Sequence, residues 1–131
     1  MAVPLSPEAI AFINEKVIAH VATLMKDGSP QVTPVWVETD GKDILINTSL
    51  DRQKWRNLKR DPRIALSIAG ADNARRTMTV RGRVIEMTTA GANDQINRLS
   101  LKYSGNPVYQ RRQEGERVTV RIEPLSVRAR V

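Results

Sequence analysis

Apolar residues recur at helical spacing close to the N-terminus, directly after a typical helix start. Ser6 can cap a helix, Pro7 suits its first position, and Glu8 complements the helix dipole. The apolar positions that follow are Ala9, Ile10, Ile13 and Val17. This pattern predicts a short helix over residues 7–16.

Beyond Val17, apolar and polar residues alternate with a period of two, which is typical of half-buried strands. Turn signals separate the first runs at Lys26-Asp27-Gly28 and at Asp40-Gly41. Pro34 lies inside the second run, so that strand is expected at a sheet edge or with a bulge. The predicted strands span residues 18–25, 30–39, 43–49, 63–69, 76–88 and 117–131, the last as a strand pair or as one strand bent at Pro124.

Two further segments predict helices between these strands. Residues 51–61 begin with a cap at Asp51 or Ser49 and end before Pro62. Residues 90–103 place apolar side chains on one face, and residues 104–115 form a polar connection. About six hairpin-connected strands with three short helices favour one mainly β domain over residues 1–131, folded as a closed or nearly closed antiparallel barrel.

The composition restricts the partners and the compartment. The formal net charge is +7, which attracts anions such as nucleic acid, acidic membranes or phosphorylated small molecules, although a merely solvated basic surface is the alternative. The chain has no cysteine and no apolar run of membrane-spanning length. Residues 1–6 lack the features of a signal peptide, so we expect a cytoplasmic protein with no membrane partner.

Most catalytic templates are absent from the sequence. His20 is the single histidine, and no paired histidines, clustered carboxylates, GxSxG, GxGxxG or Walker A pattern occurs. We therefore predict no catalytic side chain and no protein-bound metal. What remains is a reaction in which a cofactor carries the chemistry while the protein binds and orients it.

The most informative segment is residues 47–63, where a strand ends in hydroxyl residues and a cationic helix follows. Thr48 and Ser49 close the strand, and Arg52, Lys54 and Arg56 lie in the first turns of the helix. A helix start attracts phosphate through its free N–H groups and dipole, and arginine adds charge-assisted hydrogen bonds. Asp51 would compete with a phosphate unless it points away. A solvated basic helix face is the competing interpretation.

This segment resembles the strand–helix–strand region of the pyridoxamine-phosphate-oxidase-like split β-barrels, and most closely that of the small F420-dependent oxidoreductases. The string runs Thr48-Ser49, Arg52, Lys54, Arg56-Asn57-Leu58 and Arg60-Asp61-Pro62-Arg63. Weaker likenesses lie in the first hairpin, in Thr33-Pro34-Val35-Trp36 and in Val80-Arg81-Gly82-Arg83-Val84. The resemblance covers about residues 8–127.

The resemblance implies a split β-barrel homodimer with cofactor sites at the subunit interface. The phosphate is expected near Ser49, Arg52, Lys54 and Arg56. The ring system is expected beside Thr33, Pro34, Val35 and Trp36 of one strand and Asn47 and Thr48 of another. The other subunit is expected to contribute Arg75, Arg76, Thr77 and Met78.

The expected cofactor is coenzyme F420, with FMN as the alternative. F420 carries an acidic tail that suits the +7 charge, and the candidates for a tail groove are Lys59, Arg60, Arg75, Arg76, Arg111 and Arg112. The chain lacks the longer C-terminal region of authentic pyridoxamine phosphate oxidases, so vitamin B6 oxidation is not expected.

The expected reaction is hydride transfer between F420 and a small substrate with an activated double bond. Solvent or a hydroxyl such as that of Thr77 or Tyr109 would supply a proton. Two other functions stay open: an F420, FMN or haem carrier without turnover, and a nucleic-acid-binding barrel. The aromatic fraction of 4% argues against the second, because single-strand binders stack bases on aromatic rings.

Overall fold

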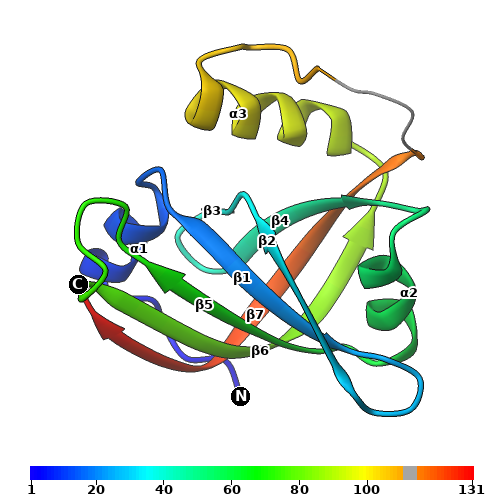
Figure 1. The fold of residues 1–131 in the computed structure, drawn as a ribbon, viewed down its shortest axis with the longest axis horizontal. Coiled ribbons are helices and arrows are strands. Elements are labelled where there is room, and N and C mark those ends of the chain that lie inside the picture. The colour runs from blue at the N-terminus through cyan, green and yellow to red at the C-terminus, as the bar shows by residue number, and fades with distance from the viewer. Residues whose placement is uncertain (111–114) are drawn as a thin grey trace.

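The protein folds as one curled antiparallel sheet with three short helices around it (Figure 1). The structure is a computed structural model that describes residues 1–110 and 115–131. The elements are α1 (Pro7–Ile13), β1 (Ile18–Leu24), β2 (Pro30–Val35), β3 (Glu38–Thr39), β4 (Ile44–Ser49), α2 (Gln53–Arg60), β5 (Arg63–Ala69), β6 (Thr77–Thr88), α3 (Ala92–Ser104) and β7 (Arg117–Arg130).

The strands are hydrogen-bonded in the order β2-β1-β5-β6-β7-β4-β3, which leaves β2 and β3 as the two edges. The pairing shifts at Arg81/Gly82 and at Val84/Glu86, where the long strand β6 pairs with β7. Irregularities of this kind bend a strand and increase its twist, which lets the sheet curl. A Cβ at Gly82 would lie 2.8 Å from the carbonyl oxygen of Glu123, so the first irregularity requires glycine.

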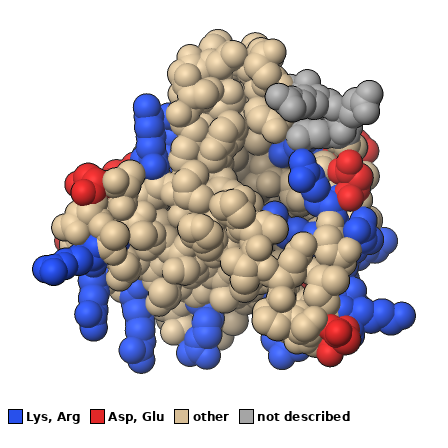
Figure 2. All heavy atoms as spheres, in the orientation of Figure 1, with Lys and Arg blue, Asp and Glu red and all other residues tan. Residues whose placement is uncertain are grey.

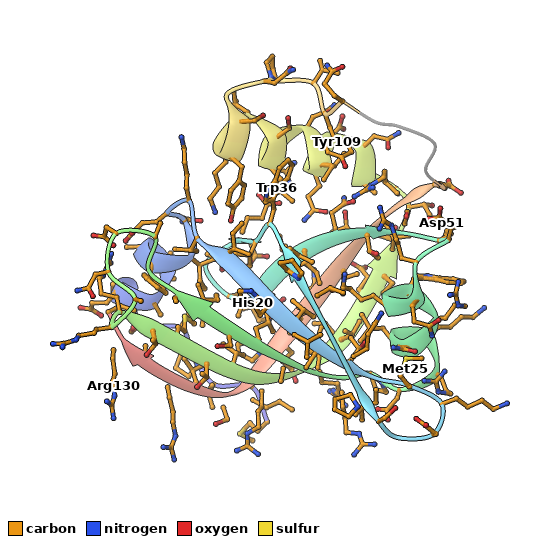
Figure 3. The ribbon with its side chains drawn as sticks, viewed as in Figure 1. His20, Met25, Trp36, Asp51, Tyr109 and Arg130 are labelled. Carbon is orange, nitrogen blue, oxygen red and sulfur yellow. The ribbon has the colours of Figure 1, made fainter. Side chains whose placement is uncertain are left out.

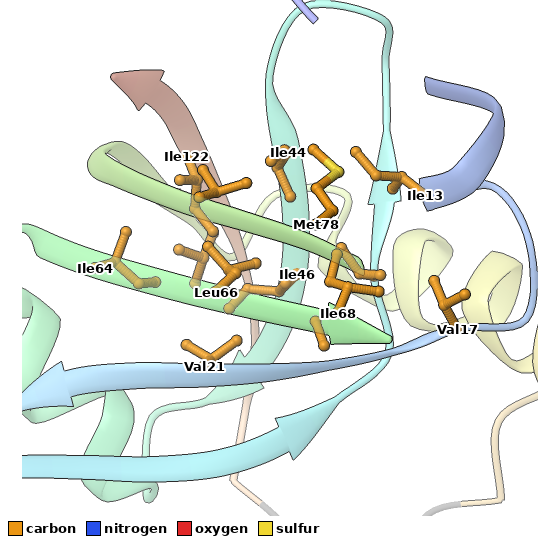
Figure 4. Packing of buried hydrophobic residues seen from close by; sticks show 14 of the residues in the cluster. Ile13, Val17, Val21, Ile44, Ile46, Ile64, Leu66, Ile68, Met78 and Ile122 are labelled. Atoms are coloured by element: carbon orange, nitrogen blue, oxygen red, sulfur yellow. The ribbon is translucent and has the colours of Figure 1, made fainter. Parts of the chain in front are cut away.

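The core fills the inside of the curl (Figure 4). In β5 the burial pattern alternates strictly, so that Ile64, Leu66 and Ile68 point inward while the residues between them point outward. The inner face of β1 contributes Ala19 and Val21 in the same way. Each of the buried isoleucine, leucine and valine side chains contributes roughly 1.5–3 kcal/mol to the free energy of unfolding, because it is removed from water on folding.

The helix α1 closes one end of the curl, while α3 lies over the sheet above β4 and β7. Ser6 caps α1 by accepting a hydrogen bond from the backbone N–H of Ala9 at 3.1 Å. The C-terminal end of α3 is tied down by Lys102, whose Nζ donates to the carbonyl oxygens of Ile13 at 2.7 Å and Val37 at 2.6 Å. These two hydrogen bonds hold α3 in place over the sheet.

The structure confirms the mainly β architecture and the order of the predicted elements, with local corrections. The predicted strand 30–39 is interrupted at Trp36 and Val37, so that β3 is an extra, seventh strand. The position of Pro34 on an edge strand is confirmed. Of the alternatives for residues 117–131, the single bent strand is confirmed. None of the helices in the described part of the chain is long and apolar enough to cross a membrane.

Candidate functional site

A pocket of about 440 Å³ opens between the sheet, the start of α2 and the underside of α3. Its volume falls within the range of small-molecule sites, which is about 300–1,000 Å³. Its lining residues come from seven parts of the chain: Ile18, Pro34, Val35, Trp36, Asn47, Thr48, Arg52, Lys54, Ile96, Leu99, Tyr109 and Arg117.

The aromatic wall of the pocket is built around Trp36, which follows β2 directly. Its indole stacks on Tyr103 of α3, with ring centroids 5.2 Å apart and planes inclined by 5°, and meets Tyr109 edge-on at 5.8 Å. The hydroxyl of Tyr103 donates to the carbonyl oxygen of Val17 and accepts from the N–H of Val37 at 3.2 Å. Figure 3 shows Trp36 and Tyr109 on the side of the sheet that α3 covers. These contacts hold a flat apolar surface in place.

The opposite end of the pocket is cationic. Lys54, in the first turn of α2, is only 9% exposed and makes no hydrogen bond or ion pair to any residue that the structure describes. Its pKa is lowered to about 8, chiefly by burial and in addition by the nearby charges of Arg52 and Arg117. A buried ammonium without a partner is costly, so this wall favours an anionic ligand.

The helix start itself is also suited to an anion. Arg52, not Asp51 or Ser49, is the N-cap of α2, its side chain makes no capping hydrogen bond, and no acidic residue lies in the first turn. The predicted cap is therefore wrong. Asp51 instead accepts a hydrogen bond from the Ser49 hydroxyl, which is the main cause of its lowered pKa, and its carboxylate packs beside Gly115. This carboxylate is absent from the pocket lining, which removes the competition with phosphate.

A buried polar network lies between the pocket and α3. Arg117 Nε donates to Asn47 Oδ1 at 2.8 Å, and Asn47 Nδ2 donates to the carbonyl oxygen of Ala92 at 3.0 Å and to Gln95 Oε1 at 2.9 Å. Thr119 donates to the same Gln95 oxygen at 2.8 Å. The network fixes the N-terminal end of α3 to β4 and β7, and it holds Arg117 at the pocket wall.

The pocket brings together many of the site residues that the sequence predicts. Those that line it are Pro34, Val35, Trp36, Asn47, Thr48, Arg52 and Lys54. Thr33 and Ser49 lie next to these residues with buried hydroxyls, and Thr33 Oγ1 has no hydrogen-bond partner among the described residues. Arg56 is exposed and donates to Gln53 Oε1 at 2.8 Å.

The predicted segment from Arg75 to Met78 lies outside this pocket in the single chain. Arg76 is paired with Glu15 at 2.7 Å and with Asp72 at 3.1 Å, and the first pair ties the β5–β6 loop to the segment that follows α1. The Met78 side chain is fully buried in the core. Arg75 is exposed and Thr77 is half-buried at the start of β6. Their assignment to a partner's site stays a prediction.

The predicted tail-groove residues are distributed over more than one part of the surface. Lys59 and Arg60 lie at the C-terminal end of α2, where Lys59 packs over the ring of Trp55 at 5.0 Å and Arg60 donates to the carbonyl oxygen of Leu24 at 2.5 Å. Arg111 and Arg112 lie outside the described residues. Figure 2 shows lysine and arginine atoms between α3 and α2 and along the lower edge of the molecule.

Three residues that line the pocket were not predicted from the sequence as parts of the site. They are Ile96 and Leu99 of α3 and the buried Arg117 of β7. The apolar face of α3 was visible in the sequence, but the pattern does not say which surface that face covers. Arg117 lies at the start of the predicted last strand, where nothing in the local sequence marks it as part of a site. Only the pairing of β7 with β4 brings it beside Asn47.

The model of the pyridoxamine 5'-phosphate oxidase family matches residues 5–130. The chain belongs to this family. Among solved structures, one named F420 reductase is 28% identical, with a TM-score of 0.81 over 90% of this chain and 94% of that one. The conserved hypothetical protein Rv2991 of Mycobacterium tuberculosis is 26% identical, with a TM-score of 0.74 over 98% and 85% of the two chains.

A more distant likeness concerns the fold alone. HupZ of Group A Streptococcus is 21% identical, with a TM-score of 0.67 over 95% of this chain and 92% of that one. The curled sheet is thus shared between these two proteins at low sequence identity. The family and the likeness to an F420 reductase support a fold of flavin- or deazaflavin-binding oxidoreductases. The pocket described above is consistent with such a fold.

Proposed function

We propose that the protein is an F420-dependent oxidoreductase that acts on a small organic molecule with an activated double bond. The observation that carries this proposal is the buried Lys54 beside Arg52, in a pocket whose other wall is aromatic and apolar. The Lys54 ammonium has no hydrogen-bond or ion-pair partner among the residues that the structure describes. A ligand that fits both walls has a phosphate at one end and a flat ring at the other.

The residues present fit such a cofactor. The uncapped start of α2, together with Arg52 and Lys54, offers N–H donors and positive charge to a phosphate. The backbone from Pro34 to Trp36, with Asn47 and Thr48, forms the neighbouring wall for a ring system. The buried hydroxyl of Thr33, which lacks a partner among the described residues, adds a polar atom close to this wall.

When bound, reduced F420 supplies a hydride to an electron-poor carbon. The chain itself contributes binding and orientation, because the cations fix the charged end while the stacked Trp36 fixes the angle of the ring surface. Ile96 and Leu99 cover the pocket from α3 and exclude water from it. Tyr109 also lines the pocket and carries a hydroxyl that can hold a proton there.

F420 is favoured over FMN by the likeness to an F420 reductase and by the net charge of +7. The acidic tail of F420 extends beyond the phosphate, so F420 carries more negative charge than FMN. A strongly basic protein therefore attracts F420 more strongly. FMN shares the phosphate and the ring system and is therefore the comparison ligand in the experiment.

The functional unit that we propose is a homodimer that contacts through the outer face of β1, β5, β6 and β7. This face carries two adjoining grooves. Their lining includes the small side chains of Ala22, Ala65, Ser67, Thr79 and Ser126, together with larger ones such as Arg63, Arg81 and Arg128. Small side chains let a second sheet approach closely, and Val32 at the rim is 59% exposed. The partner would also bring the segment from Arg75 to Met78 to the site.

The test is a parallel titration of the purified protein with F420 and with FMN in the same buffer and salt. We expect tighter binding of F420, and a loss of about tenfold to 150-fold in the variant Lys54→Met. Lys42→Met is the control, because Lys42 is exposed and lies outside both the pocket and the predicted tail groove. Equal affinity of the two variants would refute the phosphate site, and tighter FMN binding would reassign the cofactor.

Turnover is tested separately with reduced F420 and a panel of enones and quinones. Reduction of any member of the panel supports an enzyme. Tight cofactor binding without reduction of any of them would favour a carrier function.

A further inference from the structure

Arg117, the first residue of β7, lies buried at the cationic end of the pocket. It is 6% exposed, lines the pocket, and is paired across the sheet with Ser49, which immediately precedes the turn into α2. Its guanidinium carbon lies 5.2 Å from the ring centroid of Tyr109. The cationic end is therefore built from two elements, with Arg52 and Lys54 on one side and Arg117 on the other.

These charges are close enough to affect one another. Arg52 and Arg117 both lower the pKa of Lys54, in addition to the larger effect of burial. The described residues that line the pocket include no aspartate or glutamate. An anion bound at this end would favour the charged form of the buried Lys54 ammonium.

Arg117 is also held in a fixed position. Its Nε donates to Asn47 at 2.8 Å, and Asn47 in turn donates to the backbone of Ala92 and to the side chain of Gln95 in α3. The aromatic ring of Tyr109 covers the guanidinium on another side. A planar guanidinium that is already oriented loses little freedom when it binds a phosphate, whose oxygens match its paired N–H groups.

We infer that Arg117 is an anion-binding residue of this pocket and contacts the phosphate of the ligand together with Arg52 and Lys54. The ligand class is a phosphate ester. This inference rests on the proposed function, because F420 and FMN both bring a phosphate to the pocket. It adds a residue from β7 to the phosphate contacts, which the sequence places entirely in the β4–α2 segment.

The experiment compares three variants in titrations with F420 and, independently, with inorganic phosphate. Arg117→Gln removes the charge but keeps a donor for Asn47, and Arg117→Lys keeps the charge. Arg130→Gln, on the same strand and outside the pocket, is the control for lost charge. We expect Arg117→Gln to weaken both ligands by about 10- to 100-fold, Arg117→Lys by less, and Arg130→Gln by less than about threefold.

An NMR titration of Lys54 Cε adds a readout that a purely structural role would not move. We expect the pKa of Lys54 in the ligand-free protein to rise in Arg117→Gln and to stay near its original value in Arg117→Lys, because only the first variant removes the repelling charge. Circular dichroism and thermal unfolding establish that both variants are folded.

The two proposals fail in different ways. If F420 does not bind the unchanged protein while inorganic phosphate binds in a manner that depends on Arg117, the inference stands and the proposed function fails. If F420 binds Arg117→Gln as tightly as it binds Arg130→Gln, the inference is overturned and the proposed function stands. Equal losses in Arg117→Gln and Arg117→Lys, with an unchanged pKa of Lys54, would also overturn it.

Discussion

The indole of Trp36 lies parallel to the phenol ring of Tyr103, 5.2 Å away, so a residue that interrupts the edge of the sheet is fixed by a helix distant in sequence. Trp36 separates β2 from β3 and, in the same place, forms the flat wall of the pocket. The break in the predicted strand and the wall of the candidate site are thus one feature.

The substitution Trp36→Leu should weaken binding of the cofactor ring while leaving the phosphate contacts intact. Loss of an aromatic stacking surface costs about 1 kcal/mol, which corresponds to roughly a fivefold loss of affinity for F420. Isothermal titration calorimetry with F420 and with inorganic phosphate checks this. The affinity for phosphate should stay unchanged, and an equal loss for both ligands would contradict the assignment of Trp36 to the ring.

The substitution Lys54→Met should stabilise the ligand-free protein while it weakens cofactor binding. The folded protein holds the Lys54 ammonium in a buried place beside Arg52 and Arg117, so its removal relieves desolvation and repulsion. We expect the free energy of unfolding at pH 7 to increase by about 1–3 kcal/mol, measured by urea denaturation. A less stable Lys54→Met protein would show that the ammonium has a stabilising partner.

Cofactor affinity should depend on pH through Lys54. Its pKa in the ligand-free protein is about 8, against an ordinary value of 10.5, and a bound phosphate raises it again. Affinity should therefore be constant below about pH 8 and fall above it, because binding then requires uptake of a proton. Fluorescence titrations between pH 6.5 and 9.5 test this.

Lys54→Met serves as the control for this pH dependence. Lys102 also has a pKa near 8 because of burial, but it lies outside the pocket lining and is unchanged in that variant. A variant that lacks Lys54 should lose the fall in affinity above pH 8. Persistence of the same profile would assign the titration to another group.

The substitution Gly82→Ala should destabilise the sheet. The new Cβ would meet the Glu123 carbonyl oxygen and Ile122 Cγ2, each at 2.8 Å, and the backbone atom cannot move without breaking the β6–β7 pairing. We expect a loss of about 2 kcal/mol or more, measured by chemical denaturation. Gly91→Ala is the control, since it has open space and only the strain of a φ of +75°, which costs about 1 kcal/mol.

The proposed dimer face predicts the effect of a bulky charge at Ala65. Ala65 lines both grooves of the outer face, so Ala65→Arg should turn the dimer into a monomer by preventing close contact of the sheets. Light scattering coupled to gel filtration measures the mass. Ala71→Arg, in an exposed loop, adds the same charge elsewhere and should leave the mass unchanged. A dimeric Ala65→Arg would move the interface to another surface.

Local sequence patterns predict the elements well where a single periodicity decides. The strict alternation of β5 and the capped start of α1 are found as expected. The pattern does not predict the cap of α2, because Asp51 fits the capping rule but its carboxylate accepts hydrogen bonds from the Ser49 hydroxyl and the backbone of Gly115 instead. That choice depends on a neighbour distant in sequence.

The candidate site is predictable only in part for the same reason. Lys54 and Arg52 stand in one short cationic segment and are visible in the sequence. Arg117 lies far along the chain, and its role depends on the pairing of β7 with β4 and on the bond to Asn47. Residues that act through long-range pairing carry no local signal.

The edge strand β2 has a consequence for how molecules of this protein meet one another. Pro30, Val32 and Pro34 share one row of this strand, and the two prolines have no N–H to offer an incoming chain. An additional strand would find few donors along this rim, so the aromatic wall is built on an edge that resists fibre growth and strand exchange. Pairing of two copies edge to edge through β2 is therefore disfavoured.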